Sequence, residues 1–137
     1  MKVATRQQLA IIAKSEAQRC FHGTVMQMES NLQPIVEPFP GWSLEEADGM
    51  WCAAFVYYCC IKAGFIFPIK PKECKSCHLA GCGAWEEWAM SDENIIYSLT
   101  SNEMFTPEPG DIVLFDKVFS GSLEIVLNRP HSAFLLV

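Results

Sequence analysis

The spacing of apolar residues predicts a first helix over about residues 6 to 20. Apolar side chains recur there every three or four positions, at Leu9, Ile12, Ala13 and Ala17. Thr5 comes just before this stretch, and Gln8 stands three residues after Thr5, which is the pattern of a capping box at a helix start. We expect an amphipathic helix that packs its apolar face against the rest of the protein.

A second helix is predicted from Trp51 to Ala63, with Asp48 as its candidate N-terminal cap and Gly64 as its C-terminal stop. Apolar residues occupy nearly the whole circumference of this helix and not a single stripe. Such a helix has no face suited to water. We therefore expect it to be buried in the core.

Prolines and glycines predict irregular structure in two other stretches. Residues 31 to 42 contain three prolines and a glycine, which predicts a loop. Residues 66 to 83 contain two prolines, three cysteines and two glycines, and we expect little regular structure there. A short helix from Gly83 to Ala89 follows, with Trp85 and Trp88 three residues apart.

The last part of the chain has the pattern of β-strands. After the turn sequence Pro107-Glu108-Pro109-Gly110, strands are predicted at Asp111–Phe115, Leu123–Leu127 and Ser132–Val137. Because the helices come first and the strands afterwards, we predict an α+β fold in which N-terminal helices pack on an antiparallel sheet. A chain of 137 residues, half of them hydrophobic, is expected to form a single domain over residues 1–137.

Charge and hydropathy argue against two classes of partner. The net charge of −6 argues against a nucleic-acid partner. The longest uncharged apolar stretch, Met50 to Ile61, is far shorter than the roughly 20 residues of a membrane span. Lys14 and Glu16 interrupt the N-terminal apolar stretch before any signal-peptide cleavage site. We therefore expect no membrane partner and a protein that is cytoplasmic as synthesised, with its seven cysteines reduced.

Two residues have the sequence context of a catalytic pair. Cys52 lies at the start of the predicted buried helix, where the helix dipole and the first backbone N–H groups stabilise a thiolate and a developing oxyanion. His131 comes just before the apolar strand Ser132–Val137. A histidine on a strand that packs against the helix is well placed to act as the base of such a nucleophile. We predict that Cys52 is the nucleophile and His131 its general base.

Four sequence blocks occur in an order typical of one enzyme family. They are Trp51-Cys-Ala-Ala-Phe-Val56, Ala63-Gly64, Pro109-Gly-Asp-Ile-Val-Leu-Phe115 and a histidine that begins an apolar strand. This order resembles the CHAP (cysteine, histidine-dependent amidohydrolase/peptidase) domains, relatives of the NlpC-type cell-wall peptidases. The resemblance extends over residues 42–137. It implies a papain-like cysteine peptidase fold and a bacterial or phage cell-wall hydrolase, either an N-acetylmuramoyl-L-alanine amidase or a peptidoglycan endopeptidase.

The resemblance also implies a mechanism and a partner. The Cys52 thiolate would form a thioester with peptidoglycan amides, His131 would serve as general base and acid, no cofactor would take part, and the site of action would be the cell wall. The family has later strands and a polar third catalytic residue that have no counterpart in these 137 residues, so we expect C-terminal strands to be missing. The alternative is a truncated or inactive CHAP-like domain that acts as a binding or interaction module.

Two further groups of residues have competing interpretations. Four potential tetrahedral zinc ligands lie close together in the sequence, at Cys74, Cys77, His78 and Cys82. They are compressed into nine residues, so we predict free thiols and no metal. Trp51 and Trp85 are candidate substrate contacts, although tryptophans three apart on a short helix, such as Trp85 and Trp88, more often belong to the core.

Overall fold

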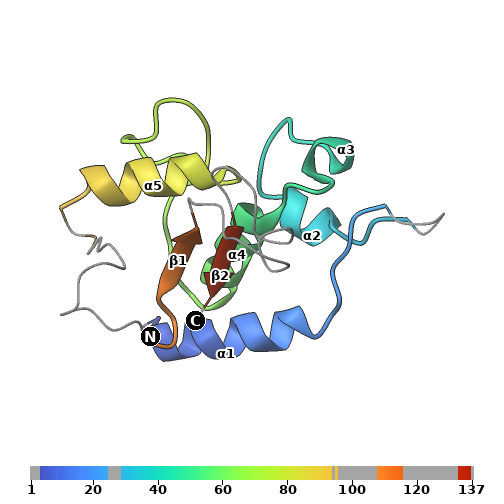
Figure 1. Ribbon diagram of the computed structural model, residues 1–137, viewed down its shortest axis with the longest axis horizontal. Coiled ribbons are helices and arrows are strands. Elements are labelled where there is room, and N and C mark those ends of the chain that lie inside the picture. The colour runs from blue at the N-terminus through green and yellow to red at the C-terminus, as the bar shows by residue number, and fades with distance from the viewer. Residues whose placement is uncertain (1–3, 25–28, 94, 96–107, 116–132, 137) are drawn as a thin grey trace, which may run out of the picture.

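Helices precede strands along the chain in the computed structural model, which describes residues 4–24, 29–93, 95, 108–115 and 133–136 (Figure 1). The helices within these ranges are α1 (Arg6–Ala17), α2 (Gln33–Val36), α3 (Leu44–Ala47), α4 (Cys52–Lys62) and α5 (Cys82–Ser91). The strands are β1 (Ile112–Phe115) and β2 (Ala133–Leu136). None of the helices described combines the length and the apolar character that a membrane span requires.

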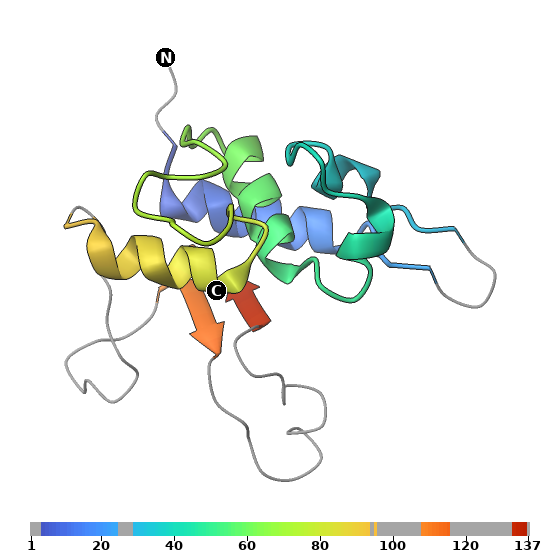
Figure 2. The same ribbon diagram turned by 90° about the horizontal axis from the view of Figure 1, so that it is seen from above.

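Helix α4 lies at the centre of the molecule. It contacts α1, α2, α5 and the strand β2, so other elements cover it on several sides (Figures 1 and 2). Most of its side chains are buried: Ala53, Ala54, Val56, Tyr57, Cys59 and Cys60. The predicted buried helix is therefore confirmed. Gly64 follows its C-terminal cap with a φ of +102°, a conformation that glycine adopts readily at a helix end.

The prediction that Asp48 caps α4 was wrong. Asp48 is the C-terminal cap of α3, a one-turn helix that the sequence pattern did not predict. This helix begins with a capping box in which the Glu46 amide donates to the Ser43 hydroxyl (3.1 Å) and the Ser43 amide donates to the Glu46 carboxylate (2.9 Å). The N-terminal cap position of α4 belongs to Trp51, whose side chain makes no capping hydrogen bond.

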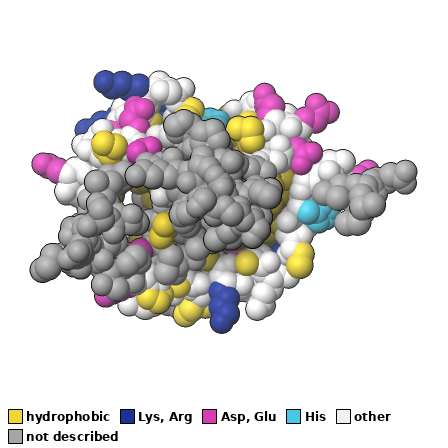
Figure 3. Space-filling view, in the orientation of Figure 1, with side chains coloured by type: hydrophobic (Ala, Val, Ile, Leu, Met, Phe, Trp, Pro, Cys, Tyr) yellow, Lys and Arg dark blue, Asp and Glu magenta, His cyan; other side chains and the backbone are white. Residues whose placement is uncertain are grey.

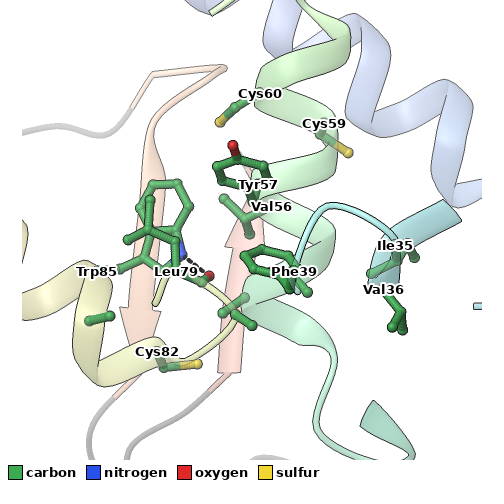
Figure 4. Close-up of a cluster of buried hydrophobic side chains, with 14 of the residues drawn as sticks. Ile35, Val36, Phe39, Val56, Tyr57, Cys59, Cys60, Leu79, Cys82 and Trp85 are labelled. Atoms are coloured by element: carbon green, nitrogen blue, oxygen red, sulfur yellow. Dashed lines mark hydrogen bonds between the residues drawn. The ribbon is translucent and has the colours of Figure 1, made fainter. Parts of the chain in front are cut away.

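The predicted loop at residues 31 to 42 includes the short helix α2 and contributes to the core. Pro34 lies in the first turn of α2, where backbone N–H groups have no partner within the helix, so the lack of an N–H in proline costs no hydrogen bond. Ile35 and Phe39 are almost completely buried, and the Phe39 ring lies 5.1 Å from that of Tyr57 on α4 (Figure 4). The prolines interrupt the helical periodicity, but the buried apolar residues between them hold the segment against α4.

Strands β1 and β2 pair antiparallel, with Ile112 opposite Leu136 and Phe115 opposite Ala133. These strands confirm two of the predicted ones, while the predicted strand Leu123–Leu127 lies outside the described residues. Between α4 and α5, residues 66 to 81 contain no helix or strand, as their prolines and glycines predicted. Helix α5 is longer at both ends than the segment 83–89 that the sequence indicated.

The end of α4 and the start of β1 both lie beside the start of α1. Gly110, just before β1, has a φ of +96°, and a Cβ there would lie 2.1 Å from the Arg6 carbonyl oxygen, so only glycine fits. A Cβ at Gly64, just after α4, would lie 3.6 Å from the Ala4 Cβ, so the end of α4 lies beside the residues that precede α1. The end of α4 and the start of β1 therefore share one side of the molecule. Because β2 is antiparallel to β1, it begins on the opposite side, where α4 also begins (Figure 1).

A partly shielded ion cluster joins α1 to α4. The Glu16 side chain is only 8% exposed, and its carboxylate accepts from Lys62 Nζ (2.5 Å), the Tyr58 hydroxyl (2.9 Å) and the Arg19 guanidinium (3.1 Å). Burial by itself raises the pKa of Glu16, but the hydrogen bonds from these three groups outweigh it and leave the pKa below the usual 4.5. The ionised form of Glu16 thus stabilises the contact between the two helices.

We expect Glu16→Gln to lower the free energy of unfolding by about 1–3 kcal/mol at pH 7, because the amide cannot accept three donors as a carboxylate does. The lowered pKa gives a stabilisation that is complete above pH 4.5 and is lost as the pH falls through the folded value. Urea unfolding at pH 7 and at pH 3 measures both effects. The wild-type protein should lose more stability between these pH values than the variant.

The exposed Glu37→Gln variant is the matched control, since it removes the same charge away from this cluster. It should leave the free energy of unfolding within about 0.5 kcal/mol of wild type. Equal effects of the two substitutions would show that net charge, and not the cluster, is responsible.

Candidate active site

Cys52 is the first residue of α4 and is half-buried. The first N–H groups of a helix have no partner inside the helix, and they carry the positive end of its dipole. A sulfur at this position is therefore in a setting that stabilises a thiolate. The helix that places Cys52 there is fixed by its buried side chains, so the nucleophile candidate stands on a rigid element.

A second cysteine meets Cys52. The Sγ atoms of Cys52 and Cys82 are 3.5 Å apart, and either thiol can donate to the other. Cys82 is the first residue of α5, so two helices begin at the same place. In Figure 4 the Cys82 side chain extends from the start of α5. The sequence analysis considered Cys82 only as a zinc ligand. Its pairing with Cys52 could have been suspected because both residues stand next to the first residue of a predicted helix.

Other cysteines of the same helix have a different environment. Cys59 and Cys60 are buried, and burial raises the pKa of each thiol to about 12. At neutral pH both are neutral thiols that pack as small apolar side chains. Cys59 thus belongs to the hydrophobic core. Position along α4 therefore separates the half-buried Cys52 from the two enclosed thiols.

His131, the predicted base, lies outside the described residues. It precedes β2 by two positions in the sequence, and β2 contacts α4. The other two histidines have local partners: His22 Nδ1 is 2.7 Å from the Gly23 carbonyl oxygen, and His78 Nδ1 accepts from the Ala80 amide (3.3 Å). These contacts give structural roles to His22 and His78.

The two tryptophans proposed as substrate contacts differ in position. Trp51 is half-buried beside Cys52, with its ring 6.2 Å from that of Phe55. Trp85 lies in the core, only 7% exposed, and its indole N–H donates to the Leu79 carbonyl oxygen (2.7 Å; Figure 4). Because its face and its donor are both used inside the protein, we assign Trp85 to the core. Trp51 stays a predicted substrate contact.

The four residues considered as zinc ligands do not converge. The buried Cys74 thiol donates to the Ala84 carbonyl oxygen (3.2 Å), and burial raises its pKa. Cys82 faces Cys52, whereas Cys77 is exposed. Across the described part of the chain, no group of three or more His, Cys, Asp or Glu side chains is arranged to hold a metal ion.

Comparison with known proteins adds no relative. The chain matches no family model, no curated protein and no solved structure. The resemblance to CHAP domains therefore rests on the sequence blocks around Cys52 and β1 alone and stays a prediction.

We expect iodoacetamide to label Cys52 at pH 7 at least about tenfold faster than Cys59, since the thiolate is the reacting form and Cys59 is almost wholly protonated. Peptide mass spectrometry after short labelling times gives the rate at each cysteine. The exposed Cys20 provides the reference for a thiol in contact with solvent.

The pH dependence separates an activated thiol from an accessible one. If the start of α4 stabilises the thiolate, the Cys52 rate should decline less than the Cys20 rate when the pH is lowered from 8 to 6. Parallel curves for the two cysteines would contradict this activation.

Proposed function

We propose that the protein is a CHAP-type cysteine hydrolase that cleaves amide bonds of peptidoglycan, with Cys52 as nucleophile and His131 as general base and acid. The observation that carries this proposal is the common location of two ends: α4 begins with Cys52 on the side of the molecule where β2 also begins. The fold proposed is accordingly papain-like, with a nucleophile helix packed on an antiparallel sheet.

The chemistry that we propose is acyl transfer. His131 takes the proton of the Cys52 thiol, the sulfur attacks the amide carbon, and the backbone N–H of Cys52 donates to the oxygen that becomes negative. The C–N bond then breaks as His131 passes the proton to the leaving amine. Water, deprotonated by His131, then attacks the thioester carbon, which breaks the C–S bond and releases the acid. Half-burial of Cys52 supports this role, because the sulfur needs both a shielded setting and access to a substrate.

The negative net charge of the protein favours a substrate recognised by shape and hydrogen bonds over one held by its own negative charge. The net charge is −6, and on the face in Figure 3 the acidic side chains of the described residues are spread over several places. A polyanion such as nucleic acid would be repelled by such a surface. Within peptidoglycan, the resemblance points to the bond between muramic acid and L-alanine or to bonds of the stem peptide and cross-bridge.

Cys52→Ala should abolish amide cleavage while the fold is kept, because alanine fits the first turn of a helix and removes only the sulfur. The assay measures free amines released from purified peptidoglycan, with circular dichroism to confirm folding. Cys77→Ala is the matched control, since it removes an exposed thiol elsewhere and should leave the rate unchanged. Undiminished release by the Cys52→Ala protein would refute the proposed mechanism.

His131→Ala should lower the rate of cleavage by about 10²- to 10⁴-fold, the usual contribution of a general acid and base. His22→Ala is the control histidine and should retain most of the activity. A folded wild-type protein that binds peptidoglycan fragments without releasing amines would instead favour the alternative, an inactive CHAP-like binding module.

A further inference from the structure

We propose that Cys52 and Cys82 form a reversible disulfide, which a hydroperoxide closes and a dithiol reopens. The pair is defined by geometry: their Sγ atoms are 3.5 Å apart, and each residue is the first of its helix. A disulfide bond is about 2.05 Å long, so closure needs an approach of roughly 1.5 Å. Side-chain rotation at the two helix starts can contribute much of this movement.

The setting of the two sulfurs favours oxidation at this pair. Helices α4 and α5 both direct the positive ends of their dipoles at the site, which stabilises a thiolate on either sulfur. A neighbouring thiol can then donate its proton to that thiolate across the 3.5 Å contact. Cys52 is half-buried and Cys82 is 7% exposed, so Cys52 is the sulfur that an oxidant in solution meets first.

The other cysteines are less suited to this reaction. Cys59 and Cys60 are enclosed, and their pKa values of about 12 keep both protonated. Cys74 is buried and donates to a carbonyl oxygen. Cys20 and Cys77 are exposed, so they are the thiols most open to contact with other molecules. Of the seven cysteines, Cys52 and Cys82 therefore best combine contact between two sulfurs with access to an oxidant.

The reaction takes place in two balanced steps. The Cys52 thiolate attacks one oxygen of the hydroperoxide and the O–O bond breaks. The leaving alkoxide or hydroxide takes up the proton that the Cys52 thiol released, so the products are a sulfenic acid and an alcohol, or water from hydrogen peroxide. The Cys82 sulfur then attacks the Cys52 sulfur, the S–O bond breaks, and hydroxide leaves with the Cys82 proton as water. Two electrons pass from the two thiols to the peroxide. A dithiol reduces the Cys52–Cys82 disulfide to two thiols by thiol–disulfide exchange and is itself oxidised to a disulfide.

This pairing has a regulatory consequence that rests on the proposed function. A disulfide occupies the sulfur that would attack the substrate, so oxidised protein would be inactive and reduction would restore cleavage. Formation of the disulfide itself does not depend on any enzymatic activity. The chemical test and the activity test can therefore fail independently.

The decisive experiment maps disulfides in the full chain after treatment with one equivalent of hydrogen peroxide. A Cys20→Ser/Cys77→Ser background removes both exposed thiols and leaves five of the seven cysteines. Thiol titration of the unfolded protein should fall from five to three, and non-reducing peptide mass spectrometry should find Cys52 joined to Cys82 with the loss of two hydrogen atoms. The yield should be independent of protein concentration, and dithiothreitol should restore five thiols.

Matched variants identify the partner. In the same background, Cys82→Ser should form no disulfide at Cys52 and should instead stop at sulfenic acid there, which a second equivalent of peroxide converts to sulfinic acid. Cys60→Ser should still form the Cys52–Cys82 link. Circular dichroism checks folding of each variant, and the mapping of the background protein decides the question even if Cys82→Ser unfolds. Overoxidation of Cys52 without a link to Cys82 in that protein would overturn the proposal, as would a link from Cys52 to another cysteine.

Discussion

The rest of the structure depends on covering a helix that is apolar nearly all round. Residues of α4 bury their side chains in several directions, so one packing partner would leave much of the helix in water. Helices α1, α2 and α5 and the strand β2 each contact it. Burying a side chain as large as Val56 or Tyr57 contributes about 1.5–3 kcal/mol, which makes this cover the main source of stability.

Polar contacts connect each end of α4 to a neighbouring helix. Its C-terminal part is tied to α1 through Glu16, whose carboxylate brings Lys62, Tyr58 and Arg19 together. Its N-terminal end meets the start of α5 through Cys52 and Cys82. The charged cluster and the thiol pair are thus at opposite ends of one helix. The ion cluster anchors the C-terminal end of α4 to α1, and the proposed chemistry of the thiol pair lies at the N-terminal end.

Sequence reasoning succeeded where periodicity extends over several turns. The capping box of Thr5 and Gln8 is present at the start of α1, and α4 and β1 have nearly the predicted bounds. It failed for α2 and α3, because a helix of one turn is too short for periodicity and depends on local caps or on burial. Asp48 was misassigned for that reason, since the cap of an unrecognised helix resembled the cap of the next one.

The candidate site was only partly predictable for a similar physical reason. The sequence pattern correctly placed Cys52 at the start of a buried helix, whereas its contact with Cys82 depends on the irregular path of residues 66 to 81, which has no periodicity. His131 stays a prediction, since it lies outside the described residues.

Depth within a single helix is enough to give chemically identical side chains different properties. Cys59 and Cys60 lie far enough along α4 to lose contact with water, and desolvation of the thiolate is the largest influence on each, which holds them protonated. Cys52 lies at the helix start, where desolvation is incomplete and the dipole favours negative charge. The same buried helix therefore holds two thiols enclosed by the core and one half-buried thiol at its start. Which environment a cysteine occupies depends on how completely the neighbouring elements enclose its side chain.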